Sequence, residues 1–93
     1  MDLRAQRAAE NERVFRRINE RVEELTPDGD PLTLVCECAD VVCVERIPGV
    51  PADEYEEVRS HGDRFFVLPG HERLDVERVV EEREGYLVVS KPA

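Results

Sequence analysis

The chain places all three of its cysteines in one short stretch, LVCECADVVC, at positions 36, 38 and 43. Three acidic residues lie around them: Glu37, Asp40 and Glu45. A reactive thiolate needs nearby positive charge or a helix N-terminus to lower its pKa, whereas negative neighbours raise that pKa. The same negative neighbours cost much less when a divalent cation lies among the thiols, because the cation is then the largest local charge. The cluster therefore predicts a bound metal rather than a catalytic or exchanging thiol.

Zinc in structural sites takes four tetrahedral ligands, mostly cysteine sulfur and histidine nitrogen. Cys36, Cys38 and Cys43 supply three of them, and the chain has two histidines for the fourth position. His71 follows Pro-Gly in a rigid turn that would aim its ring at a fixed point, so it is the favoured fourth ligand. His61 lies at the expected end of a short helix, where a histidine complements the negative helix terminus. Glu37, Asp40 or a water molecule could be the fourth ligand instead.

Other interpretations of the cysteines stay open. They could be small buried hydrophobes, or they could hold iron, although iron–sulfur clusters usually take four cysteines at other spacings. A Cys-x-Cys pair could also act as a redox sensor that releases zinc when oxidised. Zinc with an open position would be an enzyme centre, with Glu37 or Glu45 as general base beside a bound water. Because the sequence has no phosphate-binding glycine loop, no His-Glu-x-x-His and no nucleophile elbow, a non-enzymatic role is favoured.

Turn residues and hydrophobic periodicity predict one domain over residues 1–93, with a helix over 1–26 and a zinc-binding body over 31–91. Four apolar residues at spacings of three and four form the helix face expected to pack on the body: Phe15, Ile18, Val22 and Leu25. Toward the N-terminus this face becomes polar, so we expect the first turns to project past the body. The polar residues are a candidate surface for an unidentified protein partner or for self-association: Arg4, Arg7 and Asn11.

The body is expected to hold short strands and one short helix. Strands are predicted over residues 31–36, 44–47 and 64–68, with Pro48-Gly49 as a break in the chain. A helix is predicted from Pro51, with Tyr55 and Val58 facing inward and Gly62 as its C-terminal cap. Residues 74–83 fit a helix or a strand, and Glu84-Gly85 between two valine-rich runs favours a β-hairpin. The expected fold class is α+β: a long N-terminal helix, one short helix and about five strands in one small antiparallel sheet, stabilised by metal.

The charge is uneven along the 93 residues. Residues 26–93 hold sixteen acidic and seven basic residues and so carry the whole formal net charge of −9. Such a body repels phosphate backbones and anionic membranes, which argues against nucleic acid as a partner. No apolar run approaches membrane-spanning length and the charged N-terminus does not resemble a signal peptide, so a cytoplasmic location is expected. A reducing cytoplasm and an odd number of cysteines argue against structural disulfides.

Five stretches of the chain together resemble a group of small uncharacterised bacterial proteins: NERVFRRINERVEEL, LVCECADVVCVERI, EYEEVR, FFVLPGHE and ERVVEEREGYLVVSK. The resemblance covers residues 11–91. The group shares the three cysteines and the histidine of the Pro-Gly-His turn. The resemblance therefore implies that four residues act together: Cys36, Cys38, Cys43 and His71. It implies no activity, because no function is assigned to the group.

Overall fold

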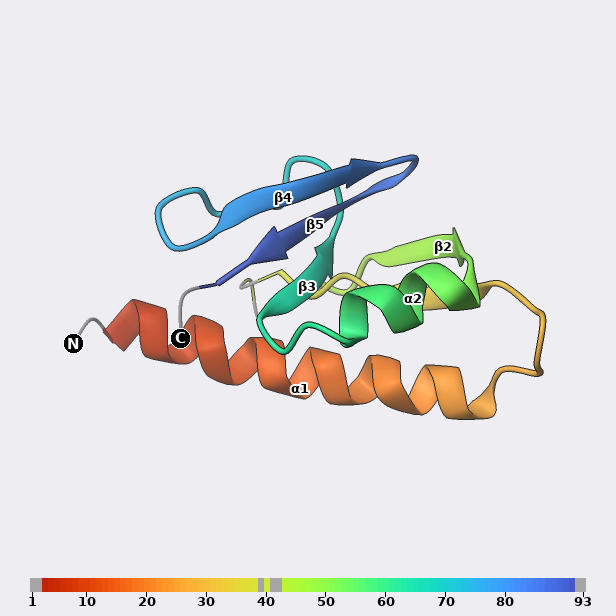
Figure 1. Ribbon diagram of the computed structural model, residues 1–93. Helices are drawn as coiled ribbons and strands as arrows, with labels where there is room; N and C mark the ends of the chain where they lie inside the picture. The colour runs from red at the N-terminus through yellow and green to blue at the C-terminus, as the bar shows by residue number, and fades with distance from the viewer. Residues whose placement is uncertain (1–2, 39, 41–42, 92–93) are drawn as a thin grey trace.

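The computed structural model describes residues 3–38, 40 and 43–91, and along the first helix it describes side chains at Glu10 and from Arg13 onward. The described elements follow in the order α1 (Leu3–Leu25), β1 (Leu32–Val35), β2 (Arg46–Val50), α2 (Ala52–Arg59), β3 (Arg64–Val67), β4 (Arg78–Arg83) and β5 (Tyr86–Ser90). The α+β class is confirmed. The expected single sheet is wrong, because the strands form two antiparallel sheets, β1-β2 and β3-β5-β4. In Figure 1, α1 runs along one side of the molecule beneath these sheets.

The segment after β1 connects the two sheets. Strand β1 pairs with β2 up to Val35, and the N–H of Cys36 still bonds to the carbonyl of Glu45. The N–H of Glu37 then donates a 2.7 Å hydrogen bond to the carbonyl of Phe66 in β3. One extended stretch thus pairs first with β2 and then with β3. The cysteines lie in this stretch and in the loop that follows it, so the strand order positions them where the sheets meet.

Pro48-Gly49 lies inside β2 and does not break the chain, which corrects the expected strand over 44–47. Between paired positions, β2 has two residues, Pro48 and Gly49, where β1 has only Thr33. Gly49 has a φ of +72°, a left-handed conformation that glycine adopts without strain. An extra residue of this kind is a β-bulge, and a bulge tolerates a proline that cannot donate to the ladder.

The short helix and the C-terminal hairpin form largely as the sequence predicts. Tyr55 and Val58 of α2 are buried. Its C-terminal cap is Ser60 in a right-handed helical conformation, so the expected cap at Gly62 is wrong. Residues 78–83 are strand β4, which pairs with β5 through a two-residue turn, and Gly85 in that turn has a φ of +87°. The hairpin alternative is therefore confirmed for this segment.

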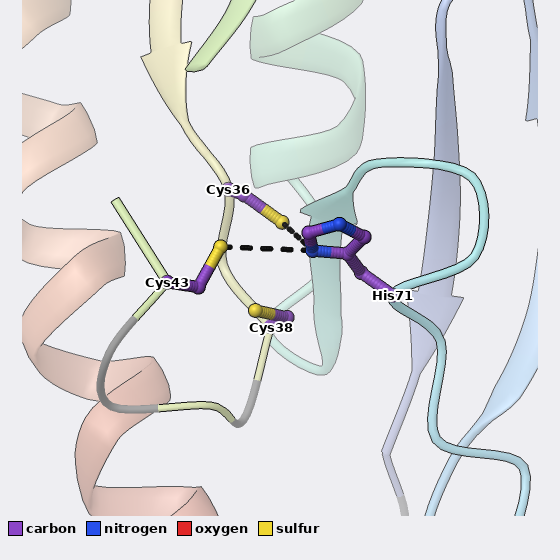
Figure 2. A group of neighbouring side chains, drawn as sticks. All are labelled: Cys36, Cys38, Cys43 and His71. Atoms are coloured by element: carbon purple, nitrogen blue, oxygen red, sulfur yellow. Dashed lines mark hydrogen bonds between the residues drawn. The ribbon is translucent and has the colours of Figure 1, made fainter. Parts of the chain in front are cut away.

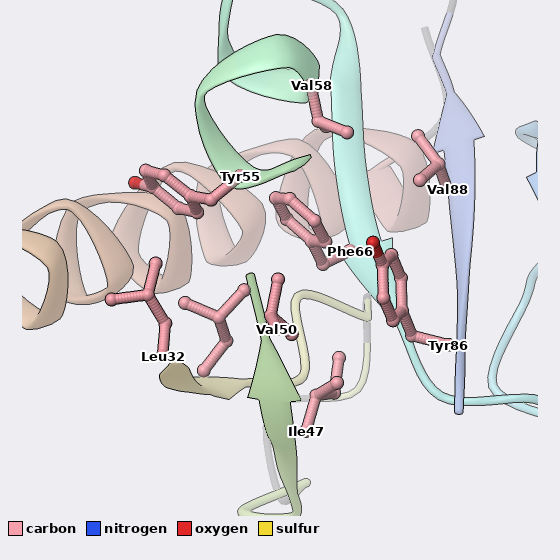
Figure 3. Packing of buried hydrophobic residues seen from close by; sticks show 9 residues of the cluster. Leu32, Ile47, Val50, Tyr55, Val58, Phe66, Tyr86 and Val88 are labelled. Atoms are coloured by element: carbon pink, nitrogen blue, oxygen red, sulfur yellow. The ribbon is translucent and has the colours of Figure 1, made fainter. Parts of the chain in front are cut away.

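Two apolar clusters lie on opposite sides of β3. The fully buried ring of Phe66 stacks on Tyr55 with ring centroids 5.6 Å apart and tilts against Tyr86 at 5.5 Å, as Figure 3 shows. The three cysteines belong to the other cluster, which also contains Phe65, Val67, Leu87 and Val89. Side chains alternate along an extended strand, so neighbouring residues of β3 serve the core and the cysteine side in turn.

The face of α1 that packs on the body is centred on a polar residue. Asn19 is fully buried and Val22 packs against the core, whereas Ile18 is 41% exposed and Leu25 is 69% exposed. The predicted stripe is therefore wrong at Ile18 and Leu25, because the helix is rotated to bring Asn19 against the segment after β1. Neither described helix has the length and apolarity needed to cross a membrane.

Glu77, just before β4, is a buried carboxylate whose removal should stabilise the fold. It is 7% exposed, and its Oε2 has no hydrogen-bond partner among the described residues. Burial raises the pKa of this carboxyl, and Lys91 opposes that shift. Since the folded pKa is raised, the folded state binds the proton more tightly than the unfolded chain, and stability falls as pH rises through that pKa.

We predict that Glu77→Gln raises the melting temperature at pH 7, by roughly 4–8 °C for each kcal/mol regained. The difference from the wild type should disappear below about pH 4, where the carboxyl is protonated in both states. Thermal unfolding followed by circular dichroism at both pH values measures this. An unchanged or lower melting temperature at pH 7 would contradict the prediction.

Candidate metal centre

Two turns bring the three cysteines and His71 together. Their ligand atoms all lie within 4.8 Å of one another, and the three thiols are buried. The cysteines come from the connection between β1 and β2, and the histidine comes from the turn after β3, at least 28 residues away in sequence. Figure 2 shows Nδ1 of the imidazole directed toward the sulfurs of Cys36 and Cys43.

The sulfur–nitrogen separations match a tetrahedral metal shell. A zinc ion about 2.3 Å from sulfur and about 2.0–2.1 Å from nitrogen places those two ligands about 3.5–3.6 Å apart. Nδ1 of His71 lies 3.6 Å from Sγ of Cys36 and 3.6 Å from Sγ of Cys43. Three sulfurs and one imidazole nitrogen are also the ligand types that zinc prefers. The residues present therefore fit a zinc ion in both chemistry and spacing.

Backbone hydrogen bonds hold the cysteine loop in shape. Cys36 N–H donates to the carbonyl of Glu45 at 3.0 Å where the loop closes, which extends the β1-β2 pairing by one residue. Within the loop, Cys43 N–H donates to the carbonyl of Asp40 at 3.1 Å. These bonds return the third cysteine to the side of the first.

The turn that carries His71 has the type II conformation that Leu-Pro-Gly-His predicts. His71 N–H donates to the carbonyl of Leu68 at 2.9 Å, and Gly70 has the positive φ, +91°, that this turn requires at its third position. Leu68 N–H in turn donates to Sγ of Cys36 at 3.3 Å. The turn thus contacts the cysteine loop through its backbone as well as through the imidazole.

Glu45 lies behind the imidazole and orients it. Its Oε2 is 3.1 Å from Nε2 of His71. A carboxylate at this position favours the tautomer with the proton on Nε2, which leaves the lone pair of Nδ1 facing the thiols. Metal-binding histidines commonly have such an outer partner. Glu45 therefore lies on the opposite side of the imidazole ring from the cysteines. A general base would have to lie on the same side as the cysteines, beside a metal-bound water.

The thiols resist joint ionisation unless a cation joins them. A hydrogen bond from Cys38 lowers the pKa of Cys36, while the same bond, together with burial, raises the pKa of Cys38. Burial also raises the pKa of Cys43, and the contact with Cys38 raises the pKa of His71. A divalent cation stabilises all three thiolates at once and displaces their protons. The electrostatics of the cluster thus favour metal binding over nucleophilic chemistry.

The other residues that the sequence suggested as metal ligands do not join the cluster, and those suggested as a partner surface are not among the residues whose side chains the structure describes. His61 and Asp40 are exposed, and neither belongs to the cluster found among the described residues. Glu37 is buried but its carboxylate turns away from the thiols and accepts the N–H of Phe66 at 2.9 Å. The side chains of the proposed partner surface lie outside the described residues: Arg4, Arg7 and Asn11.

Sequence reasoning missed the polar group directly behind the cysteines. Oε2 of Glu37 accepts hydrogen bonds from Nδ2 of Asn19, at 2.7 Å, and from the guanidinium of Arg59. Two local signals could have found it. An extended Cys-Glu-Cys stretch turns its middle side chain away from the outer two. Asn19 lies four residues after Phe15 and three before Val22, which is the spacing of a packing face.

Comparison with protein-family models, curated proteins and solved structures finds no match to this chain. The class of site is accordingly defined by its own geometry. It is a Cys3His cluster in an α+β fold, with its ligand atoms close enough to share one metal ion.

The turn at Gly70 provides a test of how the site is positioned. No atom lies within 4 Å of a Cβ built at Gly70, so a substitution there is costly only through its positive φ. We predict that Gly70→Ala destabilises the folded protein by about 1–2 kcal/mol and weakens zinc retention, because the strained turn displaces His71. Urea unfolding and metal content after dialysis measure the two effects.

Gly62→Ala is the matched control, because that position has the same open surroundings and an ordinary φ. It should resemble the wild type in both measurements. Equal effects of the two substitutions would show that the conformation of the Leu68–His71 turn does not determine the site.

Proposed function

We propose that the protein is a zinc-binding protein whose Cys3His site is structural. The observation that carries this proposal is the convergence of four zinc-type ligand atoms within 4.8 Å. Structural zinc sites are closed by four protein ligands, whereas catalytic sites keep one position for water or substrate. The ligands would be Cys36, Cys38, Cys43 and His71, so the set supports a structural metal over an enzyme centre. Three cysteines at this spacing also support zinc over an iron–sulfur cluster.

The metal would stabilise the contact between the two sheets. The cysteines follow β1, and His71 follows β3, so one ion would cross-link the ends of strands that belong to different sheets. Structural zinc contributes on the order of 10 kcal/mol or more to the folding of small zinc peptides at neutral pH. A chain of 93 residues has a limited core, and such a contribution would be a large part of its stability.

We predict that protein purified without added metal contains close to one equivalent of zinc, and that His71→Ala loses most of it on dialysis and melts at a lower temperature. The reason is that the substitution opens a shell of four ligands and leaves three thiolates without their fourth partner. Elemental analysis and thermal unfolding measure these effects. Less than about a tenth of an equivalent of any metal in the wild type would contradict a stoichiometric site.

His61→Ala is the control for this experiment. His61 is exposed and does not belong to the cluster, so its substitution should leave metal content and melting temperature at wild-type values. Loss of zinc from His61→Ala, with retention by His71→Ala, would overturn the assignment of the fourth ligand.

We propose in addition that the outer face of α1 makes the protein an interaction module. Val14, Ile18 and Leu25 are 57%, 41% and 69% exposed. With Arg21 they follow the alternating spacing of four and three residues that is typical of a helix–helix seam. Continued toward the N-terminus, the same spacing reaches the residues that sequence analysis singled out: Asn11, Arg7 and Arg4.

The occupant we propose for this face is α1 of a second copy, in antiparallel orientation. An antiparallel register that sets Val14 against Leu25 of the other copy also brings Arg17 close to its Glu24, twice by symmetry. Residues 1–25 carry six acidic and six basic residues, whereas the rest of the chain carries the whole net charge of −9. Pairing through α1 therefore avoids the repulsion that contact between the acidic bodies would bring.

We predict that the wild type self-associates in a concentration-dependent manner, that Arg17→Glu and Glu24→Arg each weaken this association, and that the double variant restores it. Sedimentation equilibrium over a concentration series measures the change. Arg78→Glu, at an exposed position on β4, is the control and should match the wild type. A monomer at every concentration would contradict the proposed pairing.

A further inference from the structure

We infer that Glu37 is a positioning residue that couples metal occupancy of the Cys3His site to the docking of α1, through Asn19. The inference rests on the proposed zinc site and adds what that metal controls. Glu37 itself touches none of the ligand atoms that would hold the ion. Its influence would run through the backbone that it shares with the cysteines on either side.

The extended Cys36-Glu37-Cys38 stretch has two chemically different sides. The two thiols face His71, and the carboxylate between them points into the protein, where Glu37 is 1% exposed. A carboxylate buried this deeply is tolerated only when charged and hydrogen-bonded partners surround it. The position of its partners therefore constrains the position of both neighbouring cysteines.

Three elements of the fold supply those partners. Oε1 of Glu37 accepts a 2.9 Å hydrogen bond from the N–H of Phe66 in β3. Oε2 accepts hydrogen bonds from Nδ2 of Asn19 in α1, at 2.7 Å, and from the guanidinium of Arg59 in α2. The guanidinium of Arg59 also contacts two aromatic rings, 5.2 Å from the ring centroid of Tyr55 and 5.2 Å from that of Phe66. Burial lowers the pKa of Arg59 to about 10, so it keeps its charge at neutral pH and pairs with the carboxylate.

Asn19 attaches α1 to the same stretch at a second point. Its Oδ1 accepts the N–H of Val35 at 2.7 Å, and its Nδ2 also donates to the carbonyl of Val35 at 2.8 Å. One amide side chain thus binds both backbone groups of the residue before Cys36 and the carboxylate of the residue after it. Because Ile18 and Leu25 are exposed, this amide is a main attachment of α1 to the body.

Metal binding and helix docking must then influence each other. An ion that fixes Cys36 and Cys38 also fixes Val35 and Glu37, which are the groups that Asn19 binds. Without the ion, the thiols lose their common partner and the stretch between them has more freedom. Two events coupled in this way change each other's equilibrium by the same factor, typically about 5- to 150-fold. Zinc occupancy would therefore control how firmly α1, with its exposed outer face, is held on the body.

The test compares zinc affinity between the wild type and Asn19→Ala, by competition with a chromophoric chelator on the full chain. We expect Asn19→Ala to bind Zn²⁺ at least about fivefold more weakly, although it removes no ligand. Glu77→Gln is the control, since it changes a buried glutamate that lies outside the metal cluster, and it should keep wild-type affinity. Affinity is compared at a temperature where the metal-free proteins are folded, because a substitution that only destabilised the fold would then lower the melting temperature and leave the zinc affinity unchanged.

Amide hydrogen exchange on the wild type gives an independent measurement that requires no variant. Exchange within residues 13–25 should accelerate when zinc is removed, by more than exchange in the β4-β5 hairpin does. Wild-type affinity in Asn19→Ala, or equal acceleration in α1 and the hairpin, would overturn the coupling. Failure of the wild type to bind Zn²⁺ at all would instead contradict the proposed site, so the two failures are distinguishable.

Discussion

Three thiols and a fully buried carboxylate share one short stretch of a chain whose formal net charge is −9. A carboxylate buried this deeply needs a positive partner, and three neighbouring thiols ionise together only beside a cation. Arg59 serves the carboxylate of Glu37 on the inner side of the stretch. The outer side gathers three sulfurs and an imidazole, for which a divalent cation is the natural partner. The carboxylate and two of the three sulfurs come from adjacent residues of one backbone, Cys36, Glu37 and Cys38.

The position of Glu37 between the cysteines also explains how the two small sheets are joined. The β1-β2 ribbon and the three-stranded sheet are joined where Glu37 pairs with the backbone of Phe66, beside the cysteines. Phe66 also centres the aromatic core, through its contacts with Tyr55 and Tyr86. The apolar core and the Cys3His cluster therefore lie on the two sides of the same strand.

Local rules were sufficient for the features that depend on neighbours in sequence. The spacing of the thiols, the Pro-Gly turn before His71 and the turn at Glu84-Gly85 each carry their own conformational signal. Features that depend on a distant partner could not be read in this way. Periodicity counted Ile18 as buried because it is apolar, but the partners of Asn19 lie at the end of β1 and just after it, in a part of the chain that follows the helix. The bulge at Pro48-Gly49 is likewise defined by pairing with β1, which the local sequence does not reveal. The proline alone therefore predicted that the strand ends there.

Anomalous diffraction at the zinc absorption edge, from crystals of protein purified without added metal, tests most directly whether a cation organises this centre. We expect one strong peak about 2.3 Å from the sulfurs of Cys36, Cys38 and Cys43 and about 2.0–2.1 Å from Nδ1 of His71. Nε2 should remain against Glu45. An ordered structure with the four side chains in place and no anomalous density among them would contradict the metal centre.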